Sequence, residues 1–250
     1  MLRCAPLVIL LAALPVGAPR QVPDATTAVR DTVQAGDPAV DASRLRPFSI
    51  ERRMTLARGD STMPFGRQSE QLMSDTLDGR PIYLDVITFE TPRATTVDSS
   101  WIDAVTLRPL RMHSSNKARV VRLEFDGRRV RERTVPAEGD PTSVDEEVAV
   151  RPFEWNMFGL AVSALPLRPG YRAAMPVYVD RFGSVIWYTV EVVRDTALVR
   201  ASGFRAPMWE VLATGDSVAP TARFWISRRH RFVDRALLTE PGVSMTYARE

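Results

Sequence analysis

Residues 151–170 read RPFEWNMFGLAVSALPLRPG, and this stretch decides the fold class. Its large apolar side chains recur at helical spacing and form one stripe, made of Trp155, Phe158, Val162 and Leu165. Pro166 and the pair Pro169-Gly170 stop the helix. We therefore predict one apolar helix at about residues 153–165, with a curved antiparallel sheet or open half-barrel wrapped around it.

The segments on either side of this helix alternate between apolar and polar residues, as β-strands do. Pro81 to Glu90 (PIYLDVITFE) is apolar on both faces, which is typical of a central strand covered on each side. Ala118 to Asp126 alternates and leads into the hairpin signal Asp126-Gly127. Its partner, Arg128 to Val135, is mostly charged, so we predict a solvated edge strand.

The remaining predicted strands share short length and flanking turn residues. They are Thr95–Asp103, Leu110–Ser115, Val144–Val150, Arg172–Arg181, Ser184–Arg194, Ala197–Ala201, Pro207–Thr214, Thr221–Ser227, His230–Thr239 and Val243–Ala248. No fixed-period repeat is present, which argues against a propeller or a solenoid. The fold class is mainly β, of the α+β kind with a single helix.

The first eighteen residues have the layout of an export signal. A positive start at Arg3 precedes the apolar run Leu7 to Leu14, and small residues follow. That run is far shorter than the ~20 residues that span a bilayer, and no later stretch is long enough to cross one as a helix. We predict a signal peptide at 1–18, a disordered linker at 19–44 and one β-rich domain at 45–250, in a protein exported to the periplasm or cell envelope.

The composition narrows the possible chemistry. The only cysteine, Cys4, lies in the predicted signal peptide, so disulfides and thiolate metal sites are excluded in the mature chain. The net charge is +3, and Lys117 is the only lysine among 33 Lys and Arg residues. Such a skew fits a GC-rich genome better than phosphate recognition, so no nucleic-acid partner is expected. We interpret the arginine groups at 128–133 and 228–231 as solvated faces of the fold rather than as contacts for an anionic surface.

A search for catalytic patterns finds only isolated residues. The two histidines, His113 and His230, stand in no metal-binding arrangement, and we predict no metal and no cofactor. Ser61 and Ser217 each end a Gly-Asp-Ser tripeptide similar to an element of some esterases, but turns use the same residues and no G-x-S-x-G elbow is present. The acidic run Asp140 to Glu147 lacks the spacing of a calcium loop. A non-enzymatic protein is therefore expected.

An open sheet around one apolar helix leaves room for a hydrophobic cavity. The candidate ligand-binding residues are Trp155, Phe158, Val162, Tyr188, Trp209 and Phe224. Our first interpretation is that these side chains fill the core, and our second is that they line a ligand site.

Three structural motifs carry a resemblance to a known family. They are Ala164–Gly170 (ALPLRPG) at the helix exit, Phe224–Ser227 (FWIS) in an aromatic strand, and the glycine-led strand Gly242–Ala248. Over about residues 101–250 the chain resembles an exported bacterial domain family of unknown function, whose members are similar in fold to Lol-type periplasmic lipoprotein carriers. The resemblance implies export and a curved sheet around a helix, and it implies no catalytic residues. The part before residue 101 shows no match.

Three functional hypotheses follow. The leading one is a non-enzymatic periplasmic or envelope protein that binds a hydrophobic or amphipathic ligand, such as a lipid. The alternative is a structural or protein-interaction module of the cell envelope with a filled core. The third is a serine hydrolase that uses Ser61 or Ser217.

Overall fold

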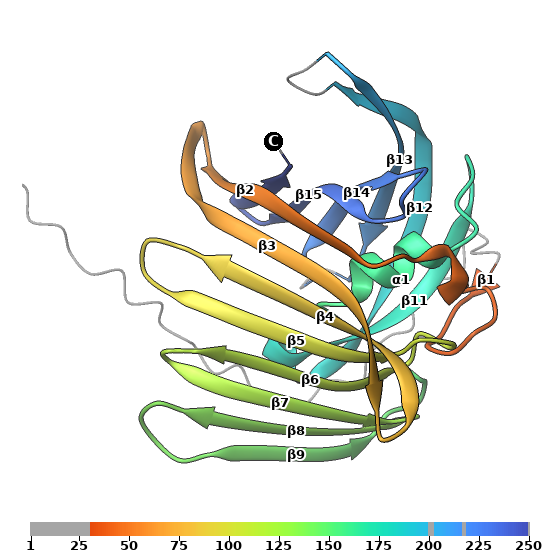
Figure 1. The fold of residues 1–250 in the computed structure, drawn as a ribbon. Helices are drawn as coiled ribbons and strands as arrows, with labels where there is room; N and C mark the ends of the chain where they lie inside the picture. The colour runs from red at the N-terminus through yellow and green to blue at the C-terminus, as the bar shows by residue number, and fades with distance from the viewer. Residues whose placement is uncertain (1–30, 200–202, 217–218, 250) are drawn as a thin grey trace, which may run out of the picture.

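The protein is built on one large open sheet, shown in Figure 1. The structure is a computed structural model, and it describes residues 31–199, 203–216 and 219–249. In these ranges α1 (Phe158–Ala164) is the only α-helix, and η1 (Ala42–Arg44) and η2 (Asp180–Phe182) are short 3-10 turns. The sixteen strands are β1 (Asp31–Thr32), β2 (Phe48–Arg58), β3 (Ser61–Leu77), β4 (Arg80–Glu90), β5 (Thr95–Asp103), β6 (Pro109–Asn116), β7 (Arg119–Asp126), β8 (Arg129–Pro136), β9 (Thr142–Glu147), β10 (Phe153–Glu154), β11 (Arg172–Val179), β12 (Ser184–Val199), β13 (Arg205–Thr214), β14 (Thr221–Ser227), β15 (Val233–Glu240) and β16 (Val243–Ala248).

Two antiparallel meanders make up this sheet. One runs from β2 to β9 and the other from β11 to β16, and they join where β16 pairs with β2. At the far end of the second meander, β1 and β10 each pair in parallel with β11. Hydrogen bonding does not close the sheet among the described strands, because β9 ends it on one side and β1, with β10, ends it on the other. The predictions of a mainly β fold and an open sheet are confirmed.

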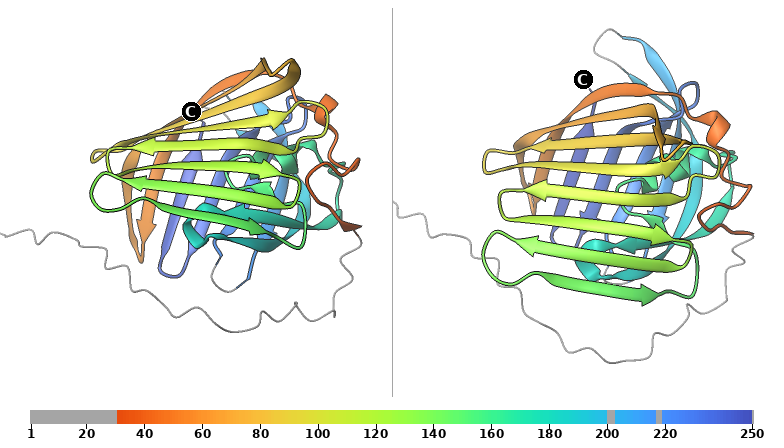
Figure 2. Two further views of the ribbon diagram at one scale, coloured as in Figure 1. Left: turned by 90° about the horizontal axis from the view of Figure 1, so that it is seen from below. Right: turned by 60° about the horizontal axis from the view of Figure 1, so that its bottom comes forward.

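Side-chain packing joins strands β6 to β8 to strand β11, between which the described residues form no backbone pairing. Figure 2 shows the meander β2–β9 lying across the front of β11–β16. Between them, apolar residues of β6, β7 and β8 pack around Tyr178 of β11, including Phe125 with its ring 6.1 Å away. The Tyr178 hydroxyl donates a hydrogen bond to Glu132 Oε2 at 3.0 Å. The curved sheet therefore has an interior, and burial of apolar surface holds it together there.

The helix is shorter than predicted. It covers Phe158–Ala164 rather than about 153–165, because Phe153 and Glu154 form β10 and pair with Val177 and Tyr178. The Glu154 carboxylate accepts the backbone N–H of Asn156 at 2.7 Å, so the chain turns before the helix begins. No helix in the described part of the chain is long and apolar enough to cross a membrane.

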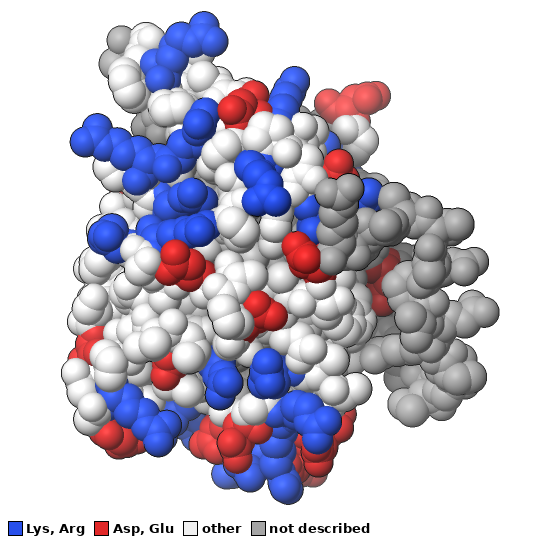
Figure 3. Space-filling view, turned by 90° about the vertical axis from the view of Figure 1, so that its right-hand side faces the viewer, with Lys and Arg blue, Asp and Glu red and all other residues white. Residues whose placement is uncertain are grey.

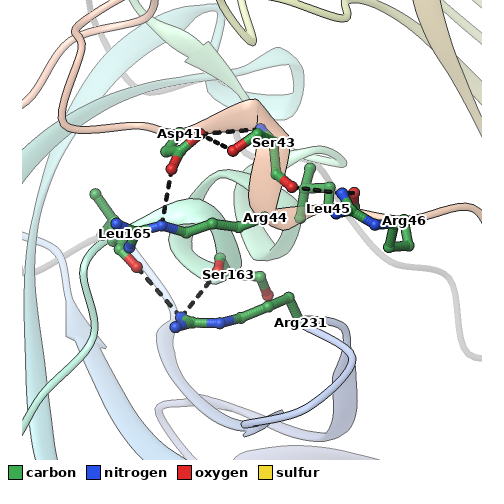
Figure 4. A network of polar contacts seen from close by, with 8 residues as sticks. All are labelled: Asp41, Ser43, Arg44, Leu45, Arg46, Ser163, Leu165 and Arg231. Carbon is green, nitrogen blue, oxygen red and sulfur yellow. Dashed lines mark hydrogen bonds and ion pairs between the residues drawn. The ribbon is translucent and has the colours of Figure 1, made fainter.

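The end of α1 is held by two distant segments, as Figure 4 shows. Arg231 donates to the carbonyls of Ser163 and Leu165, at 3.4 and 3.3 Å. The backbone N–H of Asp41 donates to the Ala164 carbonyl at 3.2 Å. These donors satisfy carbonyls that the last turn of a helix leaves without partners.

The prediction of a disordered linker at 19–44 is wrong for residues 31–44. In that part β1 pairs with β11, and Val33, Ala35, Val40 and Ala42 are buried in the main core. These apolar side chains lack the periodicity on which the prediction relied, because they stand just after a two-residue strand, in a turn, in a bend and in the short turn η1 rather than in one long element. The predicted signal peptide at 1–18 and linker residues 19–30 lie outside the described residues.

The strand at 129–136 is not the predicted edge. β9 pairs with it, and an exposed ladder of opposite charges links them. Arg129 donates to both carboxylate oxygens of Asp145, at 2.7 and 2.8 Å, and Arg128 reaches Glu147 at 2.5 Å. Figure 3 shows acidic and basic residues mixed at the bottom of the molecule, the end at which β8 and β9 lie in Figure 1. The acidic run and the arginine group, which look separate in sequence, are two sides of one pair of strands.

The two strands predicted at 184–194 and 197–201 form one long strand, β12, through Val199. A change of register between Val192 and Arg194 marks a bulge against β13. Polar residues at this bulge produce the break in alternation that the sequence shows.

Candidate functional site

A cavity of about 130 Å³ lies beside the start of α1, on the inner face of the sheet. Most of its lining is apolar, and a few polar side chains stand on one side. The lining residues are Arg52, Gln68, Glu70, Ile87, Phe89, Trp155, Asn156, Phe158, Gly159, Leu160, Phe224, Val233, Ala236, Leu238 and Tyr247. They come from β2, β3, β4, β14, β15, β16 and the segment 155–160, so the cavity spans the seam between the two meanders.

Three of the six predicted ligand-binding residues line this cavity, namely Trp155, Phe158 and Phe224. Their rings form one cluster with Tyr188. The Phe158 ring lies 5.1 Å from Tyr188 and 5.9 Å from Phe224, and the Trp155 ring lies 6.0 Å from Phe158. These are ordinary distances for interacting aromatic rings. The cluster forms a rigid apolar wall.

The other three predicted residues do not line the cavity. Val162 has no exposed surface and belongs to the core under α1. Tyr188 lies behind Trp155 and Phe158, and burial raises the pKa of its hydroxyl. Trp209 is covered by the Arg228 guanidinium, which lies 4.4 Å from the centre of the ring. Three of the six candidates thus line the cavity, and the other three belong to the core. Ligand binding by any of them stays a prediction.

An ion pair closes the polar side of the cavity. Arg52 of β2 is 3 % exposed and donates to Glu70 Oε2 at 2.5 Å and to Gln68 Oε1 at 2.9 Å. Its Nε donates to the Val233 carbonyl at 3.1 Å, and its remaining nitrogen donates to the same carbonyl. Every guanidinium nitrogen of Arg52 therefore has a protein partner, and Arg52 holds β3 and β15 together across the seam.

Asp85 of β4 lies next to this pair and has no such partner. It is 1 % exposed, and neither carboxylate oxygen has a hydrogen-bond partner among the described residues. Burial raises the pKa of Asp85 well above its usual range, and the nearby charges of Glu70 and Glu154 raise it further, while Arg52 lowers it. Its surroundings therefore favour the protonated form of the side chain.

A second buried carboxyl reaches the same place from β10. Glu154 accepts a hydrogen bond from Ser100 Oγ at 2.9 Å, and Ser100 stands directly opposite Asp85 in the sheet. Burial raises the pKa of Glu154 to about 7, and burial also raises that of Asp98, two residues before Ser100, to about 6. We call Arg52, Glu70, Asp85, Ser100 and Glu154 the polar stripe. Four of its members stand on the neighbouring strands β2 to β5, and Glu154 joins them from β10.

These raised values predict a loss of stability as pH rises. A carboxyl whose pKa is higher in the folded than in the unfolded chain holds its proton when folded and releases it on unfolding. Unfolding then becomes easier between the unfolded pKa, ~4 for Asp and Glu, and the folded values of 6 to 7. We expect the free energy of unfolding to fall by about 1.4 kcal/mol per pH unit for each such proton, as measured by urea unfolding between pH 5 and pH 7.5.

Glu154→Gln should flatten this dependence, because it removes one of the titrating groups. Asp145→Asn is the control: a hydrogen bond from Arg129 lowers the pKa of Asp145, so it titrates below this range. An unfolding free energy that stays level or rises from pH 5 to 7.5 in the wild-type protein would contradict the prediction.

The polar stripe cannot be recognised as a group in the sequence, although two of its members leave a signal there. Asp85 interrupts the apolar strand PIYLDVITFE, which is apolar on both faces only if that residue is passed over. Glu154 interrupts the apolar segment in the same way. Arg52 and Glu70 left no such signal, because β2 and β3 carry polar residues on both faces.

The predicted catalytic candidates are spread across the fold. Ser61 begins β3 directly after a turn at Gly59-Asp60, and Ser217 lies outside the described residues. His113 lies in β6, and His230 lies in an exposed turn and stacks on Phe232. Within the described ranges, no group of three or more His, Cys, Asp or Glu side chains is placed to hold a metal ion.

A larger hollow, of about 310 Å³, lies on the outer face of the sheet. It is lined by Arg172, Thr189, Glu191, Leu212, Thr214 and Gly215. Leu212 is its only large apolar side chain, so it lacks the apolar wall that ligand pockets have. The cavity beside α1 is the better candidate site.

One family model, described as a protein of unknown function (DUF3108), matches residues 44–239. The match begins at the end of η1 and covers β2 to β5, where sequence analysis finds no resemblance before residue 101. It therefore includes every residue of the cavity except Tyr247. No curated protein matches the chain.

Proposed function

The chain belongs to the DUF3108 family, and on that premise we propose that it is an exported, non-enzymatic envelope protein that binds the apolar part of an amphipathic ligand. The observation that carries the proposal is the cavity beside α1, with aromatic and aliphatic side chains around it and polar groups on one side. That combination is typical of sites for amphipathic small molecules.

In this proposal the curved sheet encloses α1 and the cavity between them, as in the Lol-type carriers that the sequence resembles. Burial of the helix agrees with it: six of its seven residues are buried. The layout of residues 1–18 supports export to the periplasm or cell envelope.

The size of the cavity limits the ligand. A volume of about 130 Å³ is close to that of an engineered cavity that holds one benzene, and is below the ~300 Å³ of small drug-sized sites. We therefore propose that only a short or terminal part of an apolar chain enters it. The rest of the ligand would lie outside the aromatic wall.

The same small volume favours a second candidate function, a structural or interaction module with a filled core. Val162 and Tyr188 have no exposed surface, so much of the region expected to form a cavity is occupied by side chains. In this alternative the cavity is a packing gap, and the protein acts through its surface. A stoichiometric protein partner that co-purifies with a ligand-free chain would favour it.

Filling the cavity tests ligand binding. Ala236 of β15 lines it, so Ala236→Phe should place a ring inside. We expect the variant to lose at least about tenfold in affinity for a lipophilic fluorescent probe, a loss of ~1.4 kcal/mol, and to lose any lipid that mass spectrometry finds in the wild-type protein.

Ala248→Phe is the matched control. Ala248 follows the cavity residue Tyr247 in β16, so its side chain points to the opposite face. This variant should bind the probe like the wild type. A purified mature protein that carries no lipid and binds no probe would refute the proposed function.

A further inference from the structure

The buried region below the cavity has more acidic than basic groups. Arg52 is the one buried basic side chain in the described ranges, and it lies near Glu70 and Asp85. Glu154 and Asp98 are further buried acidic groups of this region. Arg52 uses all its nitrogens on protein acceptors, and Glu70 takes one of them. Glu154 accepts hydrogen bonds from Ser100 and the backbone. The region therefore has more hydrogen-bond acceptors than donors. Among its acceptors, the two carboxylate oxygens of Asp85 have no partner in the described part of the chain.

Asp85 points toward the cavity side of the sheet. Side chains two apart along a strand share a face, and Ile87 and Phe89, the next two residues on this face of β4, both line the cavity. Across the strands, Glu70 of the cavity lining stands opposite Ile87. A buried carboxyl with two unpartnered oxygens therefore lies on the cavity face of β4, two residues before the cavity residue Ile87 and outside the lining itself. Such a group costs free energy unless a donor joins it.

We propose that the cavity takes a cationic amphiphile, with a primary ammonium group bound at Asp85 and its hydrocarbon chain along the aromatic wall of Trp155, Phe158 and Phe224. This inference rests on the proposed function and names the chemical class of its ligand.

The chemistry of an ammonium matches the site. It has three N–H donors and no acceptor, and Asp85 has two free acceptor oxygens. The charges of Glu70 and Glu154, which oppose ionisation of Asp85 in the free protein, would attract a cation placed among them, and the charge of Arg52 would oppose it. A carboxylate or phosphate head group would meet the same charges as repulsion, and a neutral alcohol would gain one hydrogen bond and no charge pairing.

Binding should also release a proton. Burial beside two carboxyls raises the pKa of Asp85 and favours its protonated form in the free protein. An ammonium beside it favours the ionised form, so its proton passes to the solvent when the complex forms. The number of protons released can be measured by calorimetry in two buffers of different ionisation enthalpy.

Three probes of equal chain length test the proposal on the full mature protein: octylamine, 1-octanol and octanoate, titrated at pH 7 by calorimetry. We expect octylamine to bind at least about tenfold more tightly than 1-octanol, as a charge-assisted hydrogen bond allows, with a net release of protons. Octanoate should bind most weakly of the three. Asp85→Asn should abolish the preference for the amine and leave 1-octanol affinity within about twofold, whereas Asp145→Asn on the exposed strand β9 should change neither.

The outcomes separate this inference from the proposed function. If 1-octanol binds in the cavity and octylamine binds no more tightly, the ammonium site is refuted and the hydrophobic site stands. If the amine preference survives Asp85→Asn, Asp85 is not its partner and the proposal fails. If none of the probes binds, the proposed function fails as well. If Asp85→Asn does not fold, the order of the three probe affinities and the proton release of the wild-type protein still test the proposal.

Discussion

Replacing Phe158 by alanine is expected to lower the free energy of unfolding by about 3–5 kcal/mol. The ring is 1 % exposed and contacts Trp155, Tyr188 and Phe224, so its removal leaves a void among aromatic side chains. The void would adjoin the existing cavity, and the rigid neighbours can close it only in part. Urea unfolding of the variant and the wild type, followed by tryptophan fluorescence, measures the difference.

Phe204→Ala is the control for this experiment. Phe204 is 63 % exposed and precedes β13, so the same change should shift stability by less than about 0.5 kcal/mol. A loss below about 1 kcal/mol for Phe158→Ala would show that Phe158 is not packed as the structure describes.

The second large effect is expected at the buried ion pair. Arg52→Met removes every hydrogen bond that crosses to Glu70, Gln68 and the Val233 carbonyl, and it leaves Glu70 without its partner. Breaking one side of a buried pair is expected to destabilise the protein by about 3–5 kcal/mol. The measurement is again the free energy of unfolding in urea, at pH 6.

Two further variants sharpen this result. Arg52→Met with Glu70→Met replaces both charges by apolar groups and should recover much of the lost stability, because no charge of the pair remains. Arg129→Met breaks the exposed pair between Arg129 and Asp145, whose side chains are about half exposed, and should change stability far less than Arg52→Met. Equal losses for Arg52→Met and Arg129→Met would contradict the assignment of a buried pair.

Much of the fold could be predicted from local patterns. Alternation located strands such as Arg119–Asp126 and Thr221–Ser227, and proline marked the exit of α1. The beginning of the helix could not be predicted this way, because Glu154 turns the chain through hydrogen bonds to the backbone. The order of residues 31–44 depends on non-local contacts, namely the pairing of β1 with β11 and the burial of Val33, Ala35, Val40 and Ala42 in the main core.

The candidate site was predictable only in its apolar half. Apolar residues at helix and strand positions indicated Trp155, Phe158 and Phe224. The same pattern also selected Val162, which lies in the core. Nothing local distinguishes the two groups. The polar stripe is harder still, because its members come from strands that become neighbours through non-local pairing.

The pairing of β16 with β2 determines the order in which the chain can finish folding. Strands β2 to β9 precede their last neighbour in synthesis, so the edge of β2 that receives β16 exposes unpaired N–H and C=O groups until Val243–Ala248 arrives. Contacts between such distant segments slow folding. A nascent chain therefore exposes this edge to aggregation until β16 is made, and a chain that stops before Val243 would keep it exposed.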